Sequence, residues 1–401
     1  GARSVTIVAA DDLRPDSGRR ELTVFTSSIG VLPPLRLAGE LTAAGFRVDR
    51  QQHLPELSGQ YVGTLLSATG LGLLVFGILR SGSWGFVQPK PGAPEWLGLS
   101  PVIWLILAGG VALATFIAWE NRRIAEDKGA LFDPTMLKNI GLRGGVVSFF
   151  FMFMVQAGLF FCVPLFLSIA LGLSAIETGV RLLPLSLSLL IFAAGIPRLL
   201  PDVSPRKVVR FGFMSLFAGL VLLVGLLEVG SGPEIITWPL LLAGAGLGAM
   251  ASQLGSVTVS SVSDEKSGEV GGLQNTGTQL GASIGTALAG ALLISALTAS
   301  FFTSISGHPD IPDRLASQTQ TELAAGVPFV SDAQLETALS EARVPPATAD
   351  ATVQANEQAR IDGLRAALSV LALMALSAIA FTGGIPTVQP GSESKPSAAP
   401  A

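Results

Sequence analysis

Amide side chains and glycines share one long apolar stretch of this sequence. Residues 271–297 carry no charge, and the stretch is longer than the roughly 20 residues that a helix needs to cross a bilayer. On a helix, Asn275, Gln279 and Thr286 fall within about 40° of one another. Three glycines fall on nearly the opposite side: Gly277, Gly281 and Gly285. The stretch therefore predicts a membrane helix with one polar face and one face for close helix packing.

Two interpretations of the amide face stay open. Asn275 and Gln279 can line a polar cavity inside a helical bundle, where they would contact a substrate. They can equally form hydrogen bonds to neighbouring helices and only hold the bundle together.

An aromatic stripe marks a second apolar segment, residues 145–170. Phe149, Phe153, Gln156 and Phe160 are spaced at i, i+4, i+7 and i+11, so they lie one above another on a helix. One amide among phenylalanines suits a pocket for a small lipophilic substrate, in which shape and stacking provide most of the binding. A ridge that faces lipid is the alternative, because other phenylalanines surround the same helix.

Small residues recur in a third segment, residues 237–258. Gly244, Gly248 and Ser252 stand at i, i+4 and i+8, which predicts a close-packing face. Gln253 either adds polar lining to the substrate cavity or forms a hydrogen bond to a neighbouring helix.

A short turn that joins two apolar segments concentrates charge. Its motif residues are Gly195, Arg198, Asp202, Arg206 and Lys207. Asp202 lies between the bases, so the turn can form charge pairs with a neighbouring helix end in one conformation and release them in another. The alternative is that the bases only anchor this side of the protein in the cytoplasm.

Nothing in the sequence predicts an enzyme. There is no nucleophile with a base partner, no HExxH motif, no phosphate-binding loop and no pair of carboxylates at a useful spacing. His53 and His308 are far apart and Cys162 is the one cysteine, so we expect no metal site, no disulfide and no cofactor. A net charge of −4 gives no reason to expect a nucleic-acid partner.

The composition is that of a polytopic membrane protein. Hydrophobic residues make up 49% of the chain and charged residues only 13%, against about 25% in soluble domains, and the mean hydropathy is +0.57. We therefore expect an all-α integral membrane protein whose first partner is the lipid bilayer.

Eight apolar runs predict membrane spans. They lie near residues 60–79, 101–119, 145–170, 182–200, 211–228, 237–258, 273–297 and 364–384. Residues 1–56 precede them as a leader of uncertain fold, for which we favour a loosely folded segment over one with a strand at 4–8 and a helix at 35–46. The remaining divisions are two central helices (57–119), a loop (120–144), a six-helix bundle (145–384) and a disordered tail (385–401).

Basic residues set the predicted orientation. The loops 120–144 and 198–210 are rich in Lys and Arg, whereas 172–180 and 229–236 have none. Basic loops stay in the cytoplasm, so the first two loops and both termini are predicted to be cytoplasmic. The long loop 298–363 then lies outside.

Part of that outer loop is predicted to be helical. Ser331 is a plausible N-cap, with acidic residues in the turns that follow. Pro345 and Pro346 would end that helix, and a further helix from Ala349 would lead into the last span.

Four stretches together resemble a known family. Residues 63–77, 171–184, 195–207 and 272–285 are similar, in order and spacing, to helix and loop motifs of the fourteen-helix drug:proton antiporter branch of the major facilitator superfamily. The resemblance covers residue 57 to the end. It implies that the first two spans are an extra central pair and that the last six form the C-terminal bundle.

The resemblance also implies a function. Members of this branch export hydrophobic, often cationic compounds, driven by proton entry, through a site between two six-helix bundles that rock about it. The 145–170 helix would line that site.

Departures from the family pattern limit what this chain is expected to do. The N-terminal six-helix half, with its proton-binding acids, has no counterpart in residues 1–56. Ser168 stands where many members have Gln, and Asp202 is followed by Val-Ser-Pro instead of a base and Gly. We therefore expect a truncated C-terminal portion whose partner is the missing N-terminal half, and which cannot transport alone.

Two other functions remain possible on the sequence. One is a superfamily exporter of an endogenous metabolite or lipid, which the lack of charge in the middle of the spans allows as readily as a drug. The other is a non-transporting membrane subunit that needs a partner half.

Overall fold

The computed structural model describes residues 3–9, 22–26, 46–48, 57–90, 92–126, 128, 130–260, 267–306, 331–341 and 344–387. The chain falls into two compact units, Gly1–Leu57 and Ser58–Ala401.

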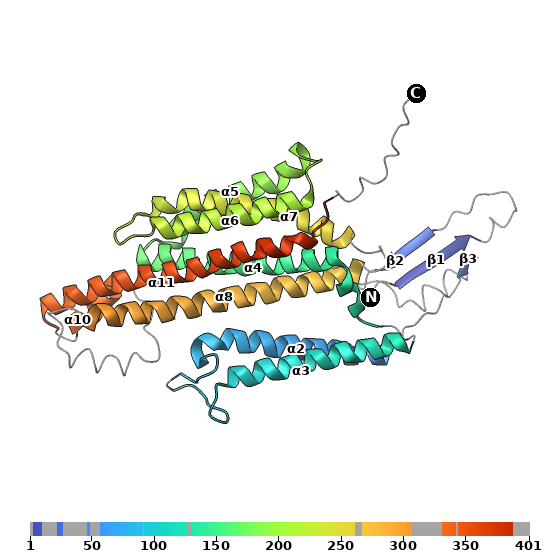
Figure 1. Ribbon diagram of the computed structural model, residues 1–401, viewed down its shortest axis with the longest axis horizontal. Coiled ribbons are helices and arrows are strands. Elements are labelled where there is room, and N and C mark those ends of the chain that lie inside the picture. Colours follow the sequence, from blue (N-terminus) through green and yellow to red (C-terminus); the bar gives the residue numbers. More distant parts are fainter. Residues whose placement is uncertain are drawn as a thin grey trace. The chain divides into compact units, whose positions relative to one another are not determined.

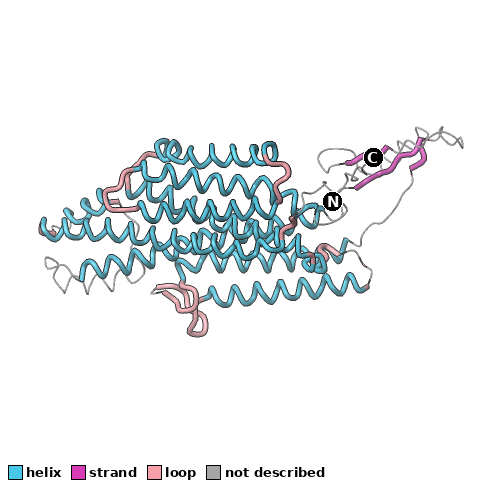
Figure 2. The backbone as a smooth tube through the Cα atoms, turned by 45° about the horizontal axis from the view of Figure 1, so that its top comes forward, coloured by secondary structure: helices cyan, strands magenta, loops and turns pink. Residues whose placement is uncertain are grey.

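Three strands form the described part of the first unit. They are β1 (Arg3–Ala9), β2 (Leu22–Thr26) and β3 (Phe46–Val48). Both outer strands pair antiparallel with β1, which is central (Figure 2, magenta). β1 covers the strand considered at residues 4–8, where Val5, Thr6 and Ile7 favour extended backbone. The helix considered at 35–46 lies outside the described residues, apart from residue 46, which begins β3.

From residue 57 onward the elements are helices (Figure 1). They are α2 (Leu57–Trp84), α3 (Pro101–Ala125), η2 (Pro134–Lys138), α4 (Ile140–Leu165), η3 (Phe166–Ala170), α5 (Ala175–Leu199), α6 (Pro205–Leu226), η4 (Pro233–Ile236), α7 (Thr237–Ser260), α8 (Ser267–Ser306), α10 (Asp332–Glu341), α11 (Pro346–Phe381) and η7 (Thr382–Gly384). Within the described residues, eight helical segments are long and apolar enough to cross a membrane. The eight predicted spans and the all-helical class of the membrane part are confirmed.

Several predicted helix ends are wrong, because an apolar run marks only the length in contact with lipid. α3 continues to Ala125, α4 begins at Ile140, α5 at Ala175 and α6 at Pro205, and α8 extends from Ser267 to Ser306. The helix predicted from Ala349 into the last span is confirmed, since α11 begins at Pro346 and continues to Phe381. Polar caps carry some helices beyond the lipid-facing run. Ser174 and Glu177 form a capping box at α5, and Asn139 accepts hydrogen bonds from the first turn of α4.

The corrected helix ends shorten two predicted loops. The stretch between α3 and α4 is residues 126–139, not 120–144, and α8 and α11 both extend into the predicted outer loop 298–363. In that loop, Ser331 Oγ accepts a hydrogen bond from Gln334 N at 3.3 Å, which confirms the predicted N-cap of α10.

Glycines bring the backbones of neighbouring helices into contact. A Cβ atom at Gly281 would collide with Phe150 O, and one at Gly285 would collide with Met154 O, so α8 lies directly against α4. Figure 1 shows α4, α8 and α11 running side by side.

Glycines also bring the backbone of α7 into contact with that of α5. A Cβ atom at Gly244 would meet Leu185 O, and one at Gly248 would meet Leu189 O. Two separate pairs of helices therefore depend on residues without a side chain, as close helix packing in a membrane requires.

Two carboxylates hold the segment between α3 and α4. Glu120, in the last turns of α3, is fully buried, and its Oε2 accepts hydrogen bonds from Leu131 N at 2.7 Å and Phe132 N at 3.4 Å. Asp133 N donates to Glu269 Oε2, in the first turn of α8, at 2.9 Å. Three successive N–H groups are thus bound by acids of two different helices.

We predict that Gly281→Ala lowers the melting temperature of the purified chain. The added methyl would force α8 away from α4, and overpacking of this kind costs about 1–3 kcal/mol. Gly272→Ala on the same helix is the matched control, because a Cβ atom there would have no neighbour within 4 Å. At that position the better helix propensity of alanine leaves stability unchanged or slightly raised. Equal losses in the two variants would contradict the packing role.

We predict that Glu120→Ala exposes the 126–134 segment to protease. Loss of the charged acceptor leaves two N–H groups without their partner, which costs about 1.5 kcal/mol and raises the open population about tenfold. Limited trypsin digestion reads this out at Lys128, the one tryptic site in the sequence of that segment. Glu95→Ala, an exposed acid before α3, is the control, and unchanged cleavage in Glu120→Ala would refute the clamp.

Candidate functional site

The aromatic stripe lies on α4 and changes from buried to exposed along the helix. Phe149 is 7% exposed, Phe153 and Gln156 are half-buried, and Phe160 is 44% exposed. The rings of Phe149 and Phe153 are 6.4 Å apart between centroids. The stripe therefore begins in the core and presents Phe153, Gln156 and Phe160 progressively to the surface.

The amide face lies on α8, away from its glycine contact. Asn275 and Gln279 are exposed, and neither side chain forms a hydrogen bond with a described residue. Thr286 is half-buried and donates its hydroxyl to Ala282 O of its own helix at 3.0 Å. In this structure the two amide side chains form no hydrogen bond to a described residue of another helix. Both interpretations of the amide face stay predictions.

The stripe and the amide face are not brought into contact. α4 meets α8 through the side that holds Phe150 and Met154, and the aromatic stripe lies about 100° around the helix from it. Asn275 and Gln279 are likewise turned away from the Gly281 side. Among the described residues no hydrogen bond or ring contact joins the two sets.

The third polar position, on α7, is in the interior. Gln253 is 3% exposed, between helix faces and not on an open surface. Its backbone carbonyl accepts the Ser256 hydroxyl at 3.0 Å. Gln253 is therefore buried, whereas Asn275 and Gln279 are exposed.

The charged turn is shorter than predicted, because most of its motif residues are helical. Gly195 and Arg198 belong to α5, Arg206 and Lys207 belong to α6, and only Asp202 lies in the turn between them. Asp202 forms no ion pair with a described residue.

The α6 bases bind a neighbouring helix end, though not through an acid. Arg206 Nε donates to Ile385 O at 2.7 Å, and Arg210 Nε donates to Thr382 Oγ1 at 2.9 Å. Both acceptors lie just beyond α11. These bases therefore join the start of α6 to the end of α11, and their predicted role in orientation stays a prediction.

Two buried polar clusters escaped prediction from the sequence. Glu120 lies one residue beyond a predicted span, although Gly63 in the span before it leaves the room that its Oε1 occupies. Arg360 on α11 is 3% exposed and binds Asp332 of α10, with Asn356 donating to the same carboxylate at 3.4 Å. No spacing in the sequence links residues 332 and 360. The predicted N-cap at Ser331 was the one sequence feature that marked the start of α10, where Asp332 lies.

Taken together, the positioned side chains are aromatic and neutral. The exposed ring of Phe160 and the half-buried ring of Phe153 can stack against a lipophilic compound, and the amides of Asn275 and Gln279 can hydrogen-bond it. Among the described residues no group of His, Cys, Asp or Glu has the arrangement of a metal site.

Comparison with known proteins gives relatives among exporters. A probable actinorhodin transporter of Streptomyces coelicolor is 27% identical over 353 residues, which are 80% of this chain and 57% of that protein. A tetracenomycin C resistance and export protein of Streptomyces glaucescens is 29% identical over 65% of this chain and 46% of its own length. The chain thus spans about half the length of the curated relatives that it matches.

Solved structures also match this chain, and we name one of them. It is a bacterial homolog of the human lysosomal transporter Spinster, in an inward-facing and occupied conformation, with 16% identity and a TM-score of 0.41 over 82% of this chain and 65% of that one. A likeness at that level supports no conclusion about this chain.

The family model described as Major Facilitator Superfamily matches residues 52–286. The match begins before α2 and extends into α8, and it covers more than half of the sequence. The chain belongs to the Major Facilitator Superfamily.

Proposed function

We propose that this chain is the C-terminal portion of an exporter that moves hydrophobic, often cationic compounds across the cell membrane in exchange for protons. The observation that carries the proposal is the amide face of α8, where Asn275 and Gln279 stay without a described partner inside an apolar span. Unpaired amides are unfavourable against lipid, so they are expected to face a polar cavity or another protein surface.

The comparisons support the same direction. Relatives in this superfamily are named for the export of, or resistance to, actinorhodin, tetracenomycin C and puromycin. These names point to a transporter and away from an enzyme. The motifs at residues 171–184 and 272–285 favour the fourteen-helix branch, and proton coupling is proposed from that resemblance.

The substrate surface is proposed to combine α4 and α8. Phe153, Gln156 and Phe160 would contact the apolar body of the compound, and Asn275 and Gln279 its polar groups. Gln253, which is buried, would contribute only if α7 turned or moved.

We further propose that transport needs a second set of membrane helices, on the same polypeptide or on a separate one. Alternating access in this superfamily uses two halves around a central site, and the relatives are about twice as long as the part matched here. Sequencing upstream of codon 1 decides whether those helices are encoded in frame. Co-purification of a separate six-span chain would instead favour the subunit alternative.

The identity of the exported compound distinguishes the endogenous-metabolite alternative from drug efflux. The test expresses the complete gene in a drug-sensitive host. Release of a lipid or metabolite, with no gain in tolerance to lipophilic cations, would favour that alternative. Energised dye export abolished by a protonophore supports the leading proposal.

We predict that Asn275→Ala and Gln279→Ala each slow proton-driven dye export about fivefold, because each removes a hydrogen bond of about 1 kcal/mol to the substrate. Initial rates are measured with the complete gene in a drug-sensitive host. Gln354→Ala, an exposed amide on α11, is the matched control. Export that falls equally in all three variants would argue against a substrate surface on α8.

We predict that the turn between α5 and α6 is cytoplasmic. Cys162 is the one cysteine and is fully buried, so an introduced thiol reports without background. A membrane-impermeant maleimide should label Glu228→Cys in intact cells and Asp202→Cys only after permeabilisation. The reverse pattern would invert the proposed topology.

A further inference from the structure

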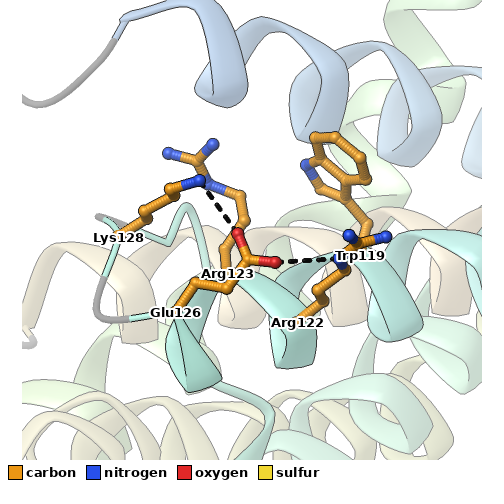
Figure 3. Close-up of a pocket in the computed structure, with 5 residues that line it drawn as sticks. All are labelled: Trp119, Arg122, Arg123, Glu126 and Lys128. Atoms are coloured by element: carbon orange, nitrogen blue, oxygen red, sulfur yellow. Dashed lines mark hydrogen bonds and ion pairs between the residues drawn. The ribbon is translucent and has the colours of Figure 1, made fainter.

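A polar cavity lies at the end of α3, apart from the proposed substrate surface. It measures about 260 Å³ and is lined by Trp119, Arg122, Arg123, Glu126 and Lys128 (Figure 3). A water molecule takes about 30 Å³ of liquid, so the cavity has room for a solvated group several atoms in size.

One carboxylate draws two of the bases together. Glu126 accepts hydrogen bonds from Arg122 Nε and from Lys128 Nζ, each at 2.9 Å, and Figure 3 shows it between them. Hydrogen bonds from Lys128 first, then from Arg122, lower the pKa of Glu126 to about 2. Glu126 is therefore ionised at physiological pH and supplies one negative charge against the two positive charges of Arg122 and Lys128.

The remaining donors are accessible. The side chain of Arg122 is 75% exposed and that of Lys128 is 48% exposed. Both terminal nitrogens of the Arg122 guanidinium bind no described protein atom. A guanidinium in that state offers the paired N–H groups that fit a phosphate.

The cavity lies at one end of a candidate membrane span. α3 is a candidate membrane span that ends at Ala125, and Trp119 stands one turn before the two arginines. Indole rings favour the headgroup level of a bilayer. We therefore expect the bases that follow Trp119 to lie at the level of the lipid phosphates or just beyond it.

We propose that this cavity binds the phosphate group of an anionic phospholipid, with Arg122 and Lys128 as its donors. Glu126 holds the two bases side by side and competes with the phosphate for them. The proposal does not depend on which compound the protein exports or on proton coupling. Free inorganic phosphate shares the same chemistry and is distinguished by the experiment.

The experiment titrates phosphatidylglycerol, and separately phosphatidylcholine, onto the delipidated full chain and counts bound lipids by native mass spectrometry. Each base near an anionic headgroup contributes about fivefold in affinity, so Arg122→Gln and Lys128→Gln should each weaken phosphatidylglycerol binding about fivefold. Glu126→Gln removes the competitor and should strengthen it. Phosphatidylcholine, with no net charge, should bind weakly to all variants.

Arg80→Gln is the matched control. Arg80 lies at the other end of the same pair of helices, over the rings of Phe76 and Trp84 at 5.5 and 5.2 Å, and lines none of this cavity. Its substitution should leave phosphatidylglycerol binding unchanged. Thermal unfolding of each variant checks that it folds. If a base substitution destabilises the chain, Glu126→Gln still tests the proposal, because it removes no base and should raise the affinity for phosphatidylglycerol.

Three results would overturn the proposal. One is equal weakening by Arg122→Gln and Arg80→Gln, which would indicate only general attraction to basic residues. Another is weaker binding in Glu126→Gln. The third is full occupation by excess inorganic phosphate without preference for the lipid, which would assign the cavity to the free ion.

Discussion

Direct contact between helix backbones is the constraint on which this bundle depends. Lipid tails are as apolar as leucine, so burial of apolar side chains gives membrane helices little reason to associate. Gly281 and Gly285 let α8 touch the carbonyl groups of α4, and Gly244 and Gly248 do the same for α7 and α5. Contact at this distance fixes the rotation of each helix about its axis. Because the glycine side of α8 packs against α4, Asn275 and Gln279 on the opposite side of α8 face away from α4.

Polar groups in the spans then fall into two classes. Many hydroxyl groups donate to a carbonyl of their own helix, as Ser283 does to Gln279 O and Thr286 to Ala282 O. Ser188 of α5 and Ser215 of α6 instead donate to carbonyls of α7, at 2.7 Å each. An amide side chain has two N–H donors and a carbonyl acceptor, and those of Asn275 and Gln279 form no hydrogen bond with a described residue. Asn275 and Gln279 consequently remain available, which makes them better candidates for substrate contact than the neighbouring threonines and serines.

The sequence predicted the number of spans because each must present about 20 apolar residues to lipid. It also placed the glycine faces, because helical periodicity is regular. Helix ends were predicted poorly, since polar caps such as Asn139 and Ser174 carry helices beyond the apolar run. Glu120 was missed for a related reason: the N–H groups that it binds belong to residues 11 and 12 positions later, in a segment with no periodic pattern.

Arginine positions show how one residue type serves topology and packing together. Arg206 and Arg210, at the start of α6, bind acceptors just beyond the C-terminal end of α11, and Arg365 of α11 binds the carbonyl of Leu227, just past the end of α6. The two helices therefore run antiparallel, and each receives cations where its backbone dipole is negative and its last carbonyls lack partners. The orientation predicted from the sequence used the first two bases only for their positive charge. The structure adds that their hydrogen bonds join the start of α6 to the end of α11. Arg365, to which the positive-inside rule was not applied, joins α11 to the other end of α6.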